Sequence, residues 1–454
     1  MNFEIKLKNI QHIKSLELKF DLSENKIMCL SGKNSVGKTT LFRSVRNLYL
    51  NNTFIETAAP YIFQDDSYIE YRVEDYVIKF SYNKRLGSID TKQDISDELK
   101  GLFLVELSIP HGERFDQFQR LSNLDEELRS KIALGEYSEA ADLIEFLNEI
   151  YCDNRFDGLK NVKIKGKDCC FILKDDVSRY YIREDYFSSG EYFLINLYRN
   201  IKRGKKVIFI DEIDISLDAS AQVNLIRSLR VYCKHYGVNI FFTTHSLALM
   251  KTLESDELFY IESYQDGSGF SIENRSYNFI KSVMYGFNGF DKYILTEDER
   301  LAHYLEYLIS DFGSVFYKYK IIYIGGASQV VDLARRNLNS SFLAKGSDVI
   351  IVLDGDQVDE EYHADFDNIN FLPFSNIEVQ VLEWYESLDE RLPKVDSIDG
   401  KKRAKRAKNL FWKLTKNDNG RQLISPEKIY NYLDDSFLDG VGELKRKIRE
   451  FLFT

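Results

Sequence analysis

The sequence predicts an α/β protein with two sheet-containing domains and a helical, basic tail. Two observations lead to this prediction. Short apolar segments that end in polar residues alternate with segments of helical periodicity, first within 27–246 and again within 292–353. Such alternation is typical of parallel strands buried beneath helices. The chain of 454 residues is also too long for one ordinary hydrophobic core, so two or three domains are expected.

The composition describes a globular chain and excludes several classes of protein. The five cysteines form no CxxC pair, which argues against a zinc site or a disulfide framework and favours a reducing, cytoplasmic location. Strand-like alternation starts close behind Met1, so we expect no signal peptide, and no apolar run approaches the ~18–20 residues that span a bilayer. The net charge of −11 does not indicate nucleic-acid binding, although a local basic surface would suffice for it.

Residues 32–39 read GKNSVGKT and follow an apolar segment. This is the pattern of a phosphate-binding loop, in its required place between a strand and a helix. Gly32 and Gly37 would let the backbone wrap closely around phosphate oxygens. Lys38 would reach the β- and γ-phosphates, and the Thr39 hydroxyl would ligate Mg²⁺. The alternative is a chance glycine turn before a helix, but the flanking strand and helix favour binding of a nucleoside triphosphate.

Periodicity and turn residues predict the elements around this loop. Alternation within 1–20 predicts a hairpin that turns near Gln11, and helical spacing predicts a helix from Thr39 to about Asn51. The other expected elements are antiparallel strands within 61–90, a strand at 102–109, a helical insertion at about 113–152 with Leu143, Phe146, Leu147 and Ile150 buried, and strands within 161–182.

A second run of motifs begins near residue 187. In chain order it contains FSSGE at 187–191 opening a helix, an apolar strand at 207–210 ending in Asp211 and Glu212, SLD at 216–218 ahead of a helix at 219–236, and a strand from 240 ending at His245. Asp211 is placed to hold the Mg²⁺ shell opposite Thr39, and Glu212 is placed to activate the attacking water. Taken alone, a strand often ends in acids and a histidine is often packed in a core. The order of the motifs favours the functional interpretation.

In this order the motifs resemble the head of an ABC-type ATPase over residues 1–285. The resemblance implies a head-to-head homodimer, in which Ser189 and Gly190 contact the γ-phosphate of an ATP held by the other protomer. It also implies that His245 senses the γ-phosphate. A transporter is a poor fit without a membrane span, which leaves the DNA-maintenance and OLD-type ATPases. The residues expected to bind the nucleotide are Gly32, Asn34, Gly37, Lys38, Thr39, Thr40, Ser189, Gly190 and Asp211. Gln64 is a candidate for the Q-loop glutamine of such heads.

The second half of the chain predicts a smaller parallel sheet. Glu297 follows its first strand, and Asp354 and Asp356 follow its third, so these carboxylates would meet at one edge. Crowded carboxylates repel one another unless a divalent cation lies among them, and oxygen ligands suit Mg²⁺ or Mn²⁺. Two such ions would favour cleavage of a phosphodiester bond. The alternative is a Rossmann-like domain whose Asp-Gly-Asp is a solvated turn.

A glutamate after the first strand, Gly-Gly after the second and Asp-x-Asp after the third resemble a TOPRIM domain, here over 286–390. The resemblance implies that Glu378 and Glu299 are further metal ligands, beside Glu297, Asp354 and Asp356. Where the family usually has glycine, this chain has Asp298. That extra acid would alter the metal affinity or weaken the active site.

An ABC-type head ahead of a TOPRIM domain is the architecture of the OLD family of nucleases, which this chain resembles. The resemblance implies an ATP-gated DNA endonuclease that uses Mg²⁺ or Mn²⁺ and acts in bacterial anti-phage defence. Such nucleases are sometimes encoded beside a helicase or a retron reverse transcriptase with its nucleic acid. The helical tail at 391–454 adds a basic run at 401–408, with Phe411 and Trp412 behind it. This run would bind nucleic-acid phosphates, or it is a solvated helix face.

Two other functions remain open. The chain could be an ATP-switched sensor or scaffold whose carboxylates no longer cut and which controls a separate toxic or nuclease partner, and Asp298 keeps this alternative alive. A DNA-repair ATPase of the SMC type would explain the head but leave the second domain without a function.

Overall fold

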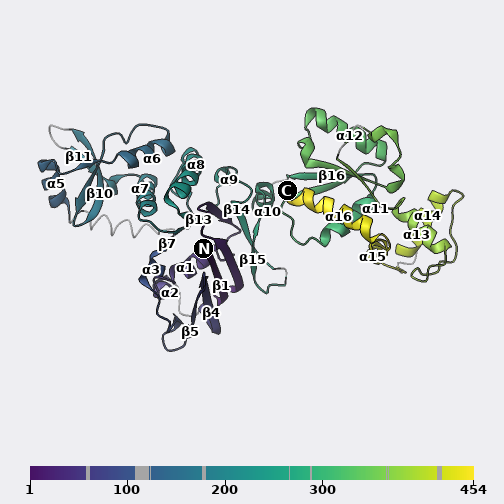
Figure 1. The fold of residues 1–454 in the computed structure, drawn as a ribbon, viewed down its shortest axis with the longest axis horizontal. Helices are drawn as coiled ribbons and strands as arrows, with labels where there is room; N and C mark the ends of the chain where they lie inside the picture. The colour runs from purple at the N-terminus through teal and green to yellow at the C-terminus, as the bar shows by residue number, and fades with distance from the viewer. Residues whose placement is uncertain are drawn as a thin grey trace. The chain divides into compact units, whose positions relative to one another are not determined.

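The computed structural model describes residues 1–57, 62–107, 122, 124–175, 180–264, 266–286, 289–364, 366, 368–416 and 422–454. The chain divides into two compact units, Met1–Ile280 and Lys281–Thr454, and helix α10 (Tyr277–Tyr285) crosses from one to the other. Figure 1 colours the first unit from purple to teal and the second from green to yellow. The start of the predicted helical insertion, 113–121, lies outside the described residues.

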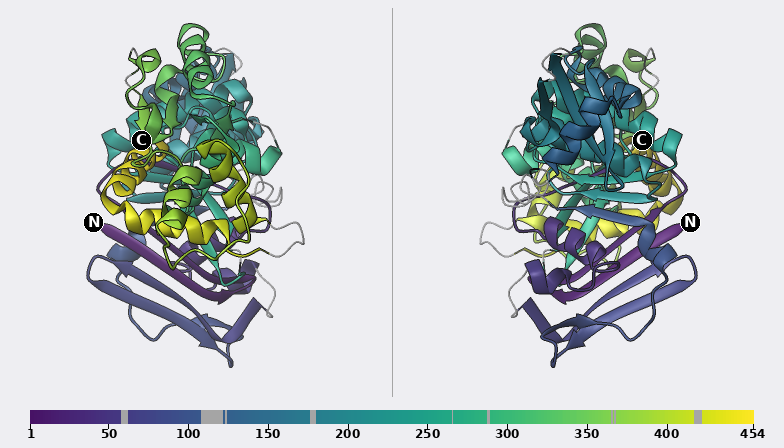
Figure 2. Two further views of the ribbon diagram at one scale, coloured as in Figure 1. Left: turned by 90° about the vertical axis from the view of Figure 1, so that its right-hand side faces the viewer. Right: turned by 90° about the vertical axis from the view of Figure 1, so that its left-hand side faces the viewer.

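Unit 1 contains a large mixed sheet. Its described strands are β1 (Asn2–Ile10), β2 (Ile13–Asp21), β3 (Ile27–Ser31), β4 (Phe63–Val73), β5 (Tyr76–Asn83), β6 (Ser88–Asp90), β7 (Phe103–Glu106), β12 (Val207–Ile210), β13 (Asn239–Thr243), β14 (Leu258–Ser263) and β15 (Phe270–Asn274). They lie in the order β6-β5-β4-β1-β2-β15-β14-β3-β13-β12-β7. β1 lies between β2 and β4 as long antiparallel neighbours, seen in purple and blue in Figure 2.

The other half of this sheet is mainly parallel and carries the predicted nucleotide motifs. β3 pairs in parallel with β13, β13 with β12, and β12 with β7. Every residue of β3, β12 and β13 is buried, as the apolar runs predicted. The carboxyl ends of these strands therefore meet at one edge of the sheet.

Helices pack on this sheet and form a lobe beside it. The described helices of unit 1 are α1 (Lys38–Arg46), α2 (Thr53–Thr57), α3 (Asp97–Gly101), α5 (Asp125–Leu134), α6 (Ala141–Tyr151), α7 (Ser189–Lys202), α8 (Ala219–Tyr236) and α9 (Leu247–Met250). Phe42 of α1 meets Phe209 of β12 edge-on, with ring centroids 5.1 Å apart, which holds the helix behind the phosphate loop. The helix ends at Arg46, earlier than the predicted Asn51, because Asn47 caps it and the asparagine-rich segment that follows forms turns.

The lobe contains a second, antiparallel sheet in the order β11-β10-β9-β8. Its strands are β8 (Ser138–Glu139), β9 (Leu159–Ile164), β10 (Lys167–Asp175) and β11 (Tyr180–Arg183). The stripe of α6 predicted to be buried is buried, and α6 contacts both α7 and α8. The packed core between α6, α7 and α8 therefore fixes the position of α7, which begins at Ser189.

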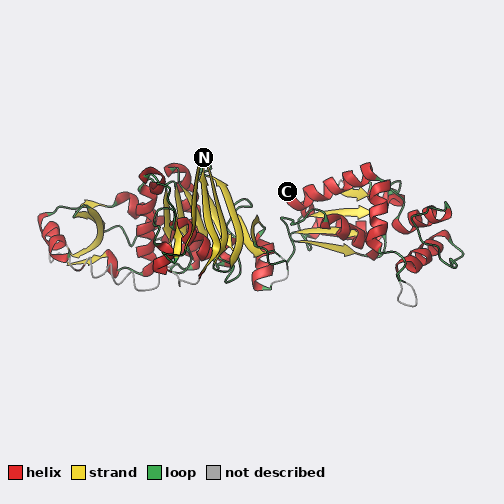
Figure 3. Cartoon of the chain, turned by 90° about the horizontal axis from the view of Figure 1, so that it is seen from below, coloured by secondary structure: helices red, strands yellow, loops and turns green. Residues whose placement is uncertain are grey.

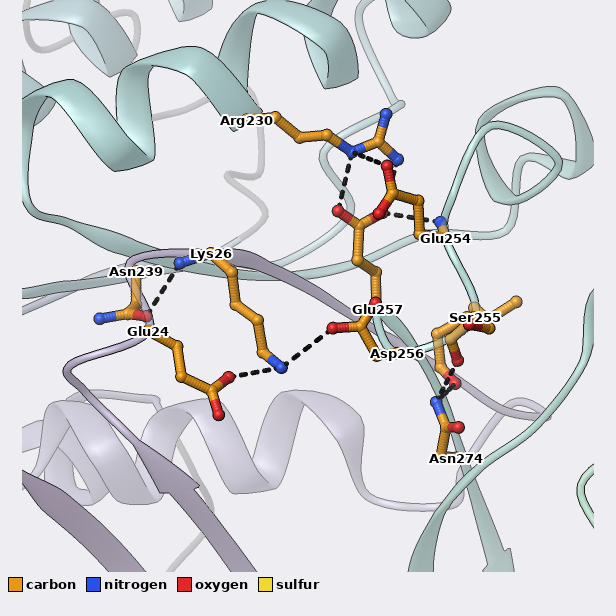
Figure 4. A network of polar contacts seen from close by, with 10 residues as sticks. Glu24, Lys26, Arg230, Asn239, Glu254, Ser255, Asp256, Glu257 and Asn274 are labelled. Carbon is orange, nitrogen blue, oxygen red and sulfur yellow. Dashed lines mark hydrogen bonds and ion pairs between the residues drawn. The ribbon is translucent and has the colours of Figure 1, made fainter. Parts of the chain in front are cut away.

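A polar network fixes the opposite, amino end of the parallel strands (Figure 4). The backbone N–H of Lys26, just ahead of β3, donates to Oδ1 of Asn239 at the start of β13 (3.1 Å). The Arg230 side chain of α8 donates through Nε to Oε1 of Glu257, just ahead of β14 (2.7 Å). The network ties α8, β3, β13 and β14 together away from the motif-bearing edge.

Unit 2 is built around a small parallel sheet, ordered β17-β16-β18-β19. Its strands are β16 (Lys292–Thr296), β17 (Tyr319–Tyr323), β18 (Val349–Leu353) and β19 (Ile369–Phe371). Alternate residues serve two cores: Leu295 and Ile351 pack with α12 (Ala327–Ser340), whereas Ile294 and Ile350 pack with the helices on the other face. Figure 3 shows these strands in yellow between red helices. The parallel α/β organisation predicted for this region is confirmed.

The C-terminal helices belong to unit 2 rather than to a separate tail. The other helices of this unit are α11 (Glu299–Ser310), α13 (Ile377–Glu386), α14 (Arg403–Thr415), α15 (Pro426–Ser436) and α16 (Leu438–Phe453). Their apolar faces share one core with the sheet, in which Phe411 is fully buried. Trp412 keeps 39% of its surface exposed. No helix among the described residues is long and apolar enough to cross a membrane.

Candidate functional sites

The phosphate loop has the backbone that its sequence requires. Gly37 has a positive φ of 99°, and a Cβ atom there would lie 2.6 Å from Cδ1 of Ile13 in the β1–β2 hairpin. A Cβ on Gly32 would lie 2.5 Å from Cγ2 of Ile261. Both glycines are therefore needed for close packing and Gly37 also for its conformation. Asn34 is exposed on the loop, and Thr40, behind it, donates its hydroxyl hydrogen to the side chain of Gln11.

Lys38 points back over the loop. Its Nζ donates to the carbonyl oxygens of Gly32 (2.7 Å) and Lys33 (3.0 Å), and the residue is 8% exposed. Burial lowers the pKa of Lys38, while Asp211 and Glu212 oppose that shift. A buried ammonium group held over backbone carbonyls is placed to meet an anionic ligand.

Asp211 joins the loop to the two neighbouring strands. The Thr39 hydroxyl donates to Oδ2 of Asp211 (2.7 Å), and the Thr243 hydroxyl donates to Oδ1 (2.6 Å). Asp211 follows β12, whereas Thr243 ends β13. The structure thus brings together the threonine and the aspartate that the sequence assigned to one Mg²⁺ shell.

Glu212 and His245 lie at the same edge. Glu212 has a positive φ of 56°, and its backbone N–H donates to the hydroxyl oxygen of Thr243 (2.7 Å). His245 follows β13, and its pKa is lowered by burial and by the charge of Lys38, against the opposing charges of Asp214, Glu212 and Asp211. Both predicted residues are therefore within electrostatic range of Lys38, and the neutral imidazole is favoured.

The Ser-Ser-Gly-Glu turn begins α7 with a capping box. Ser188 accepts from the backbone N–H of Glu191 (3.2 Å), and Glu191 accepts from that of Ser188 (2.8 Å). Ser189, the next residue, is exposed. Gly190 is buried, and a Cβ there would lie 2.4 Å from the Ser216 carbonyl oxygen. Its nearest neighbours belong to the segment after Asp211 and to α6, not to the phosphate loop of the same chain.

Glu106 is a residue that the sequence reading missed. It ends β7, beside β12, and its carbonyl oxygen accepts from the backbone N–H of Asp211 (2.8 Å). The pKa of its side chain is raised to about 7, because burial outweighs a hydrogen bond from Asn200 of α7 and the charge of Arg203. Gln64, the candidate for a Q-loop, instead lies exposed on β4. Glu106 lies beside Asp211 because β7 pairs with β12, and this strand order cannot be predicted from the sequence.

In unit 2, the first and third motifs meet directly. Oε1 of Glu297, just after β16, accepts from the backbone N–H of Asp354, just after β18 (2.9 Å). A Cβ on Gly355 would lie 2.2 Å from the carbonyl oxygen of Phe374, so only glycine fits between the two aspartates. Asp356 receives a hydrogen bond from the Asn376 side chain (3.3 Å).

Carboxylate charges converge on Asp354. Its pKa is raised to about 9, mainly by burial and then by the charges of Glu297, Asp298, Asp356 and Glu378, in that order. Burial also raises the pKa of Glu297 and of Glu378. Four of the five acids expected as metal ligands therefore act on one another at the carboxyl edge of the sheet.

Two acids of this region lie outside this set of four: Asp298, whose charge also acts on Asp354, and Glu299. Asp298 is the N-cap of α11, where its Oδ1 accepts from the backbone N–H of Leu301 (2.9 Å). Asp298, which replaces the glycine usual in TOPRIM domains, therefore stabilises the start of a helix. Glu299 is exposed, and it is not among the charges that act on Asp354.

The donor set fits a divalent cation in chemistry but not in spacing. Carboxylate oxygens are what Mg²⁺ and Mn²⁺ prefer, and their mutual repulsion at Asp354 would be relieved by a positive ion. Within the described ranges, however, no three His, Cys, Asp or Glu side chains are close enough together to hold a metal ion. Glu297, Asp354 and Asp356 would have to move closer to do so.

The basic run of the tail lies on α14, which packs against α13, the helix that carries Glu378. Arg403 and Arg406 form ion pairs with Glu383 (2.6 Å) and Glu386 (3.0 Å) of α13. The exposed lysines of the run have no ion-pair partner in the described part of the chain; they are Lys401, Lys402, Lys405 and Lys408. Part of the predicted phosphate-binding charge is thus used within the fold.

Comparison with known proteins gives likenesses of structure only. No protein-family model matches the sequence, and no curated protein matches it. The SMC head domain from Thermotoga maritima matches at 15% identity with a TM-score of 0.36, over 60% of this chain and 98% of that one.

Two further structures are similar at the same level. An Smc head domain from Pyrococcus furiosus, with an extended coiled coil and bound to the C-terminal domain of ScpA, matches at 10% identity with a TM-score of 0.40, over 62% of this chain and 98% of that one. The ATP-binding cassette MJ0796, in a dimeric post-hydrolysis state with ADP and phosphate, matches at 14% identity with a TM-score of 0.31, over 59% of this chain and 96% of that one.

Proposed function

We propose that the protein is an ATP-gated nuclease of the OLD type. Unit 1 binds and hydrolyses ATP, and unit 2 hydrolyses DNA phosphodiester bonds with Mg²⁺ or Mn²⁺. The observation that carries the nuclease assignment is the convergence of four carboxylate charges on the half-buried Asp354 at the carboxyl edge of a parallel sheet.

In unit 1, the chain's own residues account for nucleotide binding. Lys38 would exchange its two backbone carbonyl partners for phosphate oxygens of ATP. Thr39 and Asp211 would hold Mg²⁺, which neutralises the developing phosphate charge. Glu212, fixed by its backbone hydrogen bond to Thr243, would take the proton of the attacking water.

In unit 2, Glu297, Asp354 and Asp356 would hold the divalent ions, which stabilise the attacking and leaving oxygens of the phosphodiester. Asp354 prefers its protonated form without a cation, so cation binding must release that proton. The TOPRIM resemblance also implies that Glu378 and Glu299 bind metal. Glu378 is buried near the other carboxylates, so it is the better candidate for a ligand, whereas Glu299 is exposed.

DNA is the proposed substrate because the exposed lysines without ion-pair partners among the described residues lie on α14 and just before it. This helix packs against α13, which carries Glu378 of the proposed metal site. The charge of these lysines would meet backbone phosphates with little sequence preference. A homodimer would form through the heads, with Ser189 and Gly190 completing the ATP site of the partner. We place the protein in anti-phage defence, with a retron reverse transcriptase or a helicase as a possible genetic neighbour, on the OLD resemblance alone.

The alternative function is an ATP-switched sensor that controls a separate toxic partner. It is favoured by the absence, among the described residues, of three acidic side chains close enough to hold a metal ion. In that case the carboxylates of unit 2 would be a relic of a nuclease, and only unit 1 would turn over a substrate.

A plasmid-nicking assay separates these functions. The wild-type protein and the double variant Asp354→Ala/Asp356→Ala would be incubated with supercoiled plasmid in Mg²⁺ or Mn²⁺, with and without ATP. Asp332→Asn/Asp435→Asn, which removes two acids elsewhere in unit 2, is the matched control. We expect metal-dependent nicking by the wild type and the control but not by the double variant, with ATP changing the rate. Intact ATP hydrolysis without nicking by any protein would overturn the nuclease in favour of the sensor.

A further inference from the structure

Arg300 lies where the carboxylates of unit 2 meet the C-terminal helices. It stands in the first turn of α11, shortly after Glu297. Its guanidinium carbon is 4.1 Å from the centre of the Phe411 ring on α14, and its Nε is 3.6 Å from Oε1 of Glu378 on α13. One side chain thus touches three helices beside the proposed catalytic edge.

The donors of Arg300 are poorly used within the described part of the chain. Its Nε is buried and has no hydrogen-bond partner there. The distance to Glu378 is longer than the ~2.7–2.9 Å of a charge-assisted hydrogen bond. Tyr430 of α15 is 3% exposed, and its hydroxyl group makes no well-formed hydrogen bond within the described residues. Its pKa is raised to about 12 by burial, against the charge of Arg300 and a weak hydrogen bond from the same side chain.

The charge of Arg300 is also incompletely neutralised. Burial raises the pKa of Glu378, with Arg300 and Lys408 acting against that shift, so its negative charge is a weak counterion. The Arg300 side chain retains 30% exposure. A partly exposed guanidinium that lies over an aromatic ring and has a weak counterion has the features of a site for an oxyanion.

We propose that Arg300 binds a non-bridging phosphate oxygen of a nucleic-acid backbone and thereby sets the strand against Asp354 and Asp356. This inference rests on the proposed function of unit 2. An anionic backbone approaching four carboxylates needs compensating positive charge close to them. Of the two cations that act on Glu378, Arg300 is the one that lies 3.6 Å from its carboxylate, whereas Lys408 acts from farther away. Arginine suits this task because its planar fork can meet two phosphate oxygens at once.

Equilibrium binding of a fluorescent single-stranded DNA tests the proposal. The full chain would be titrated in Ca²⁺ at several salt concentrations, with the DNA checked on a gel for cleavage. Arg300→Met keeps an apolar stem over Phe411 but removes the charge. We expect it to weaken binding at least about tenfold, which corresponds to about 1.4 kcal/mol. The logarithmic salt dependence should also decrease by about 0.7.

Two further variants keep the test decisive. Arg336→Met removes an exposed arginine of α12 that pairs with Asp332 (2.7 Å), and it should bind DNA within about twofold of the wild type, as expected for a surface ion pair. Arg300→Lys keeps the charge and loses the fork, so it should weaken binding several-fold with the salt dependence unchanged. If Arg300→Met fails to fold, Arg300→Lys decides alone: wild-type affinity in that variant overturns the proposal. Wild-type affinity and salt dependence in a folded Arg300→Met overturn it as well.

Competition with inorganic phosphate identifies the source of the phosphate group. If phosphate binds through Arg300 while DNA affinity is unaffected by Arg300→Met, the site serves a free phosphate and the nucleic-acid assignment is wrong. Cleavage in Mg²⁺ or Mn²⁺ is measured separately on the same DNA. Arg300-dependent binding without cleavage would refute the nuclease but keep the phosphate site, whereas cleavage and binding unchanged by Arg300→Met would refute only the site.

Discussion

Thr39 and Asp211 are hydrogen-bonded to each other across 172 positions of sequence, with the threonine hydroxyl 2.7 Å from the carboxylate. In the proposed function, both side chains would bind the same Mg²⁺ ion. Thr39→Val keeps the shape of the side chain and removes its oxygen, so it should weaken ATP binding at least about tenfold in Mg²⁺ and little in EDTA. Ser44→Ala on the same helix, whose hydroxyl bonds to the Thr40 carbonyl oxygen, is the control. Equal loss with and without Mg²⁺ would contradict the assignment.

Lys38→Ala should reduce ATP affinity by about 100-fold or more, because two charge-assisted hydrogen bonds to phosphate would be lost. Calorimetric titration measures the change. Lys33→Ala removes a neighbouring, exposed lysine of the same loop and should change the affinity by less than about threefold, as expected for a surface charge. Unchanged affinity in Lys38→Ala would refute the phosphate-loop assignment.

Glu212→Gln should slow ATP hydrolysis about 100-fold or more and leave ATP binding intact, because only the general base is removed. Trapped ATP should then hold two heads together. Size-exclusion chromatography with light scattering at saturating ATP should report a dimer for this variant. Glu98→Gln, which changes an exposed glutamate of α3 outside the motifs, should turn over ATP and show no such trapping. A monomeric Glu212→Gln protein would count against the head-to-head arrangement.

The raised pKa of Asp354 predicts how unit 2 responds to pH. Its pKa of about 9 in the folded protein exceeds the ordinary value of 3.8, so between these values the folded state holds a proton that the unfolded state releases. Stability in EDTA should therefore fall as the pH rises from about 4 to about 9 and level off above. Asp354→Asn should flatten this dependence in thermal unfolding scans, whereas exposed Asp435→Asn should not. Identical pH profiles for wild type and Asp354→Asn would refute the burial of that charge.

Gly355→Ala should destabilise unit 2 by about 1–3 kcal/mol, the usual cost of forcing an added carbon into a packed site. The new Cβ would meet the Phe374 carbonyl oxygen at 2.2 Å and that of Leu372 at 2.6 Å. Gly326→Ala is a matched control, because no atom lies within 4 Å of its Cβ and its φ of −177° is open to any residue. Chemical denaturation gives both values, and equal stability of the two variants would contradict the close packing.

Local sequence patterns predicted what depends on local geometry. The phosphate loop, the strand ending in Asp211 and the buried stripe of α6 each follow from the order of neighbouring residues, and the structure has them as predicted. The sequence did not predict the positions of Glu106 and Arg300. The order of the strands brings Glu106 beside Asp211, and the packing of the helices brings Arg300 over Phe411.

Ionic pairing and helix caps were equally hidden in the sequence. The arginines of α14 pair with acids of α13, which no charge count reveals. The sequence predicted that Asp298 would alter the metal affinity or weaken the active site. It did not show that the side chain of Asp298 caps a helix, because that role depends on the backbone at this position. The metal ligands assigned by the TOPRIM resemblance remain predictions.

The contact between Gly190 and Ser216 has a mechanical consequence. With no side chain between them, the first turn of α7 rests directly on the backbone that leads away from Asp211 and Glu212. In the proposed dimer, a displacement of that turn by the other protomer would therefore also displace the backbone that follows Glu212. In the proposed head-to-head dimer, nucleotide binding by one head would thereby affect the Glu212 of the other. The two heads would then hydrolyse ATP together rather than independently.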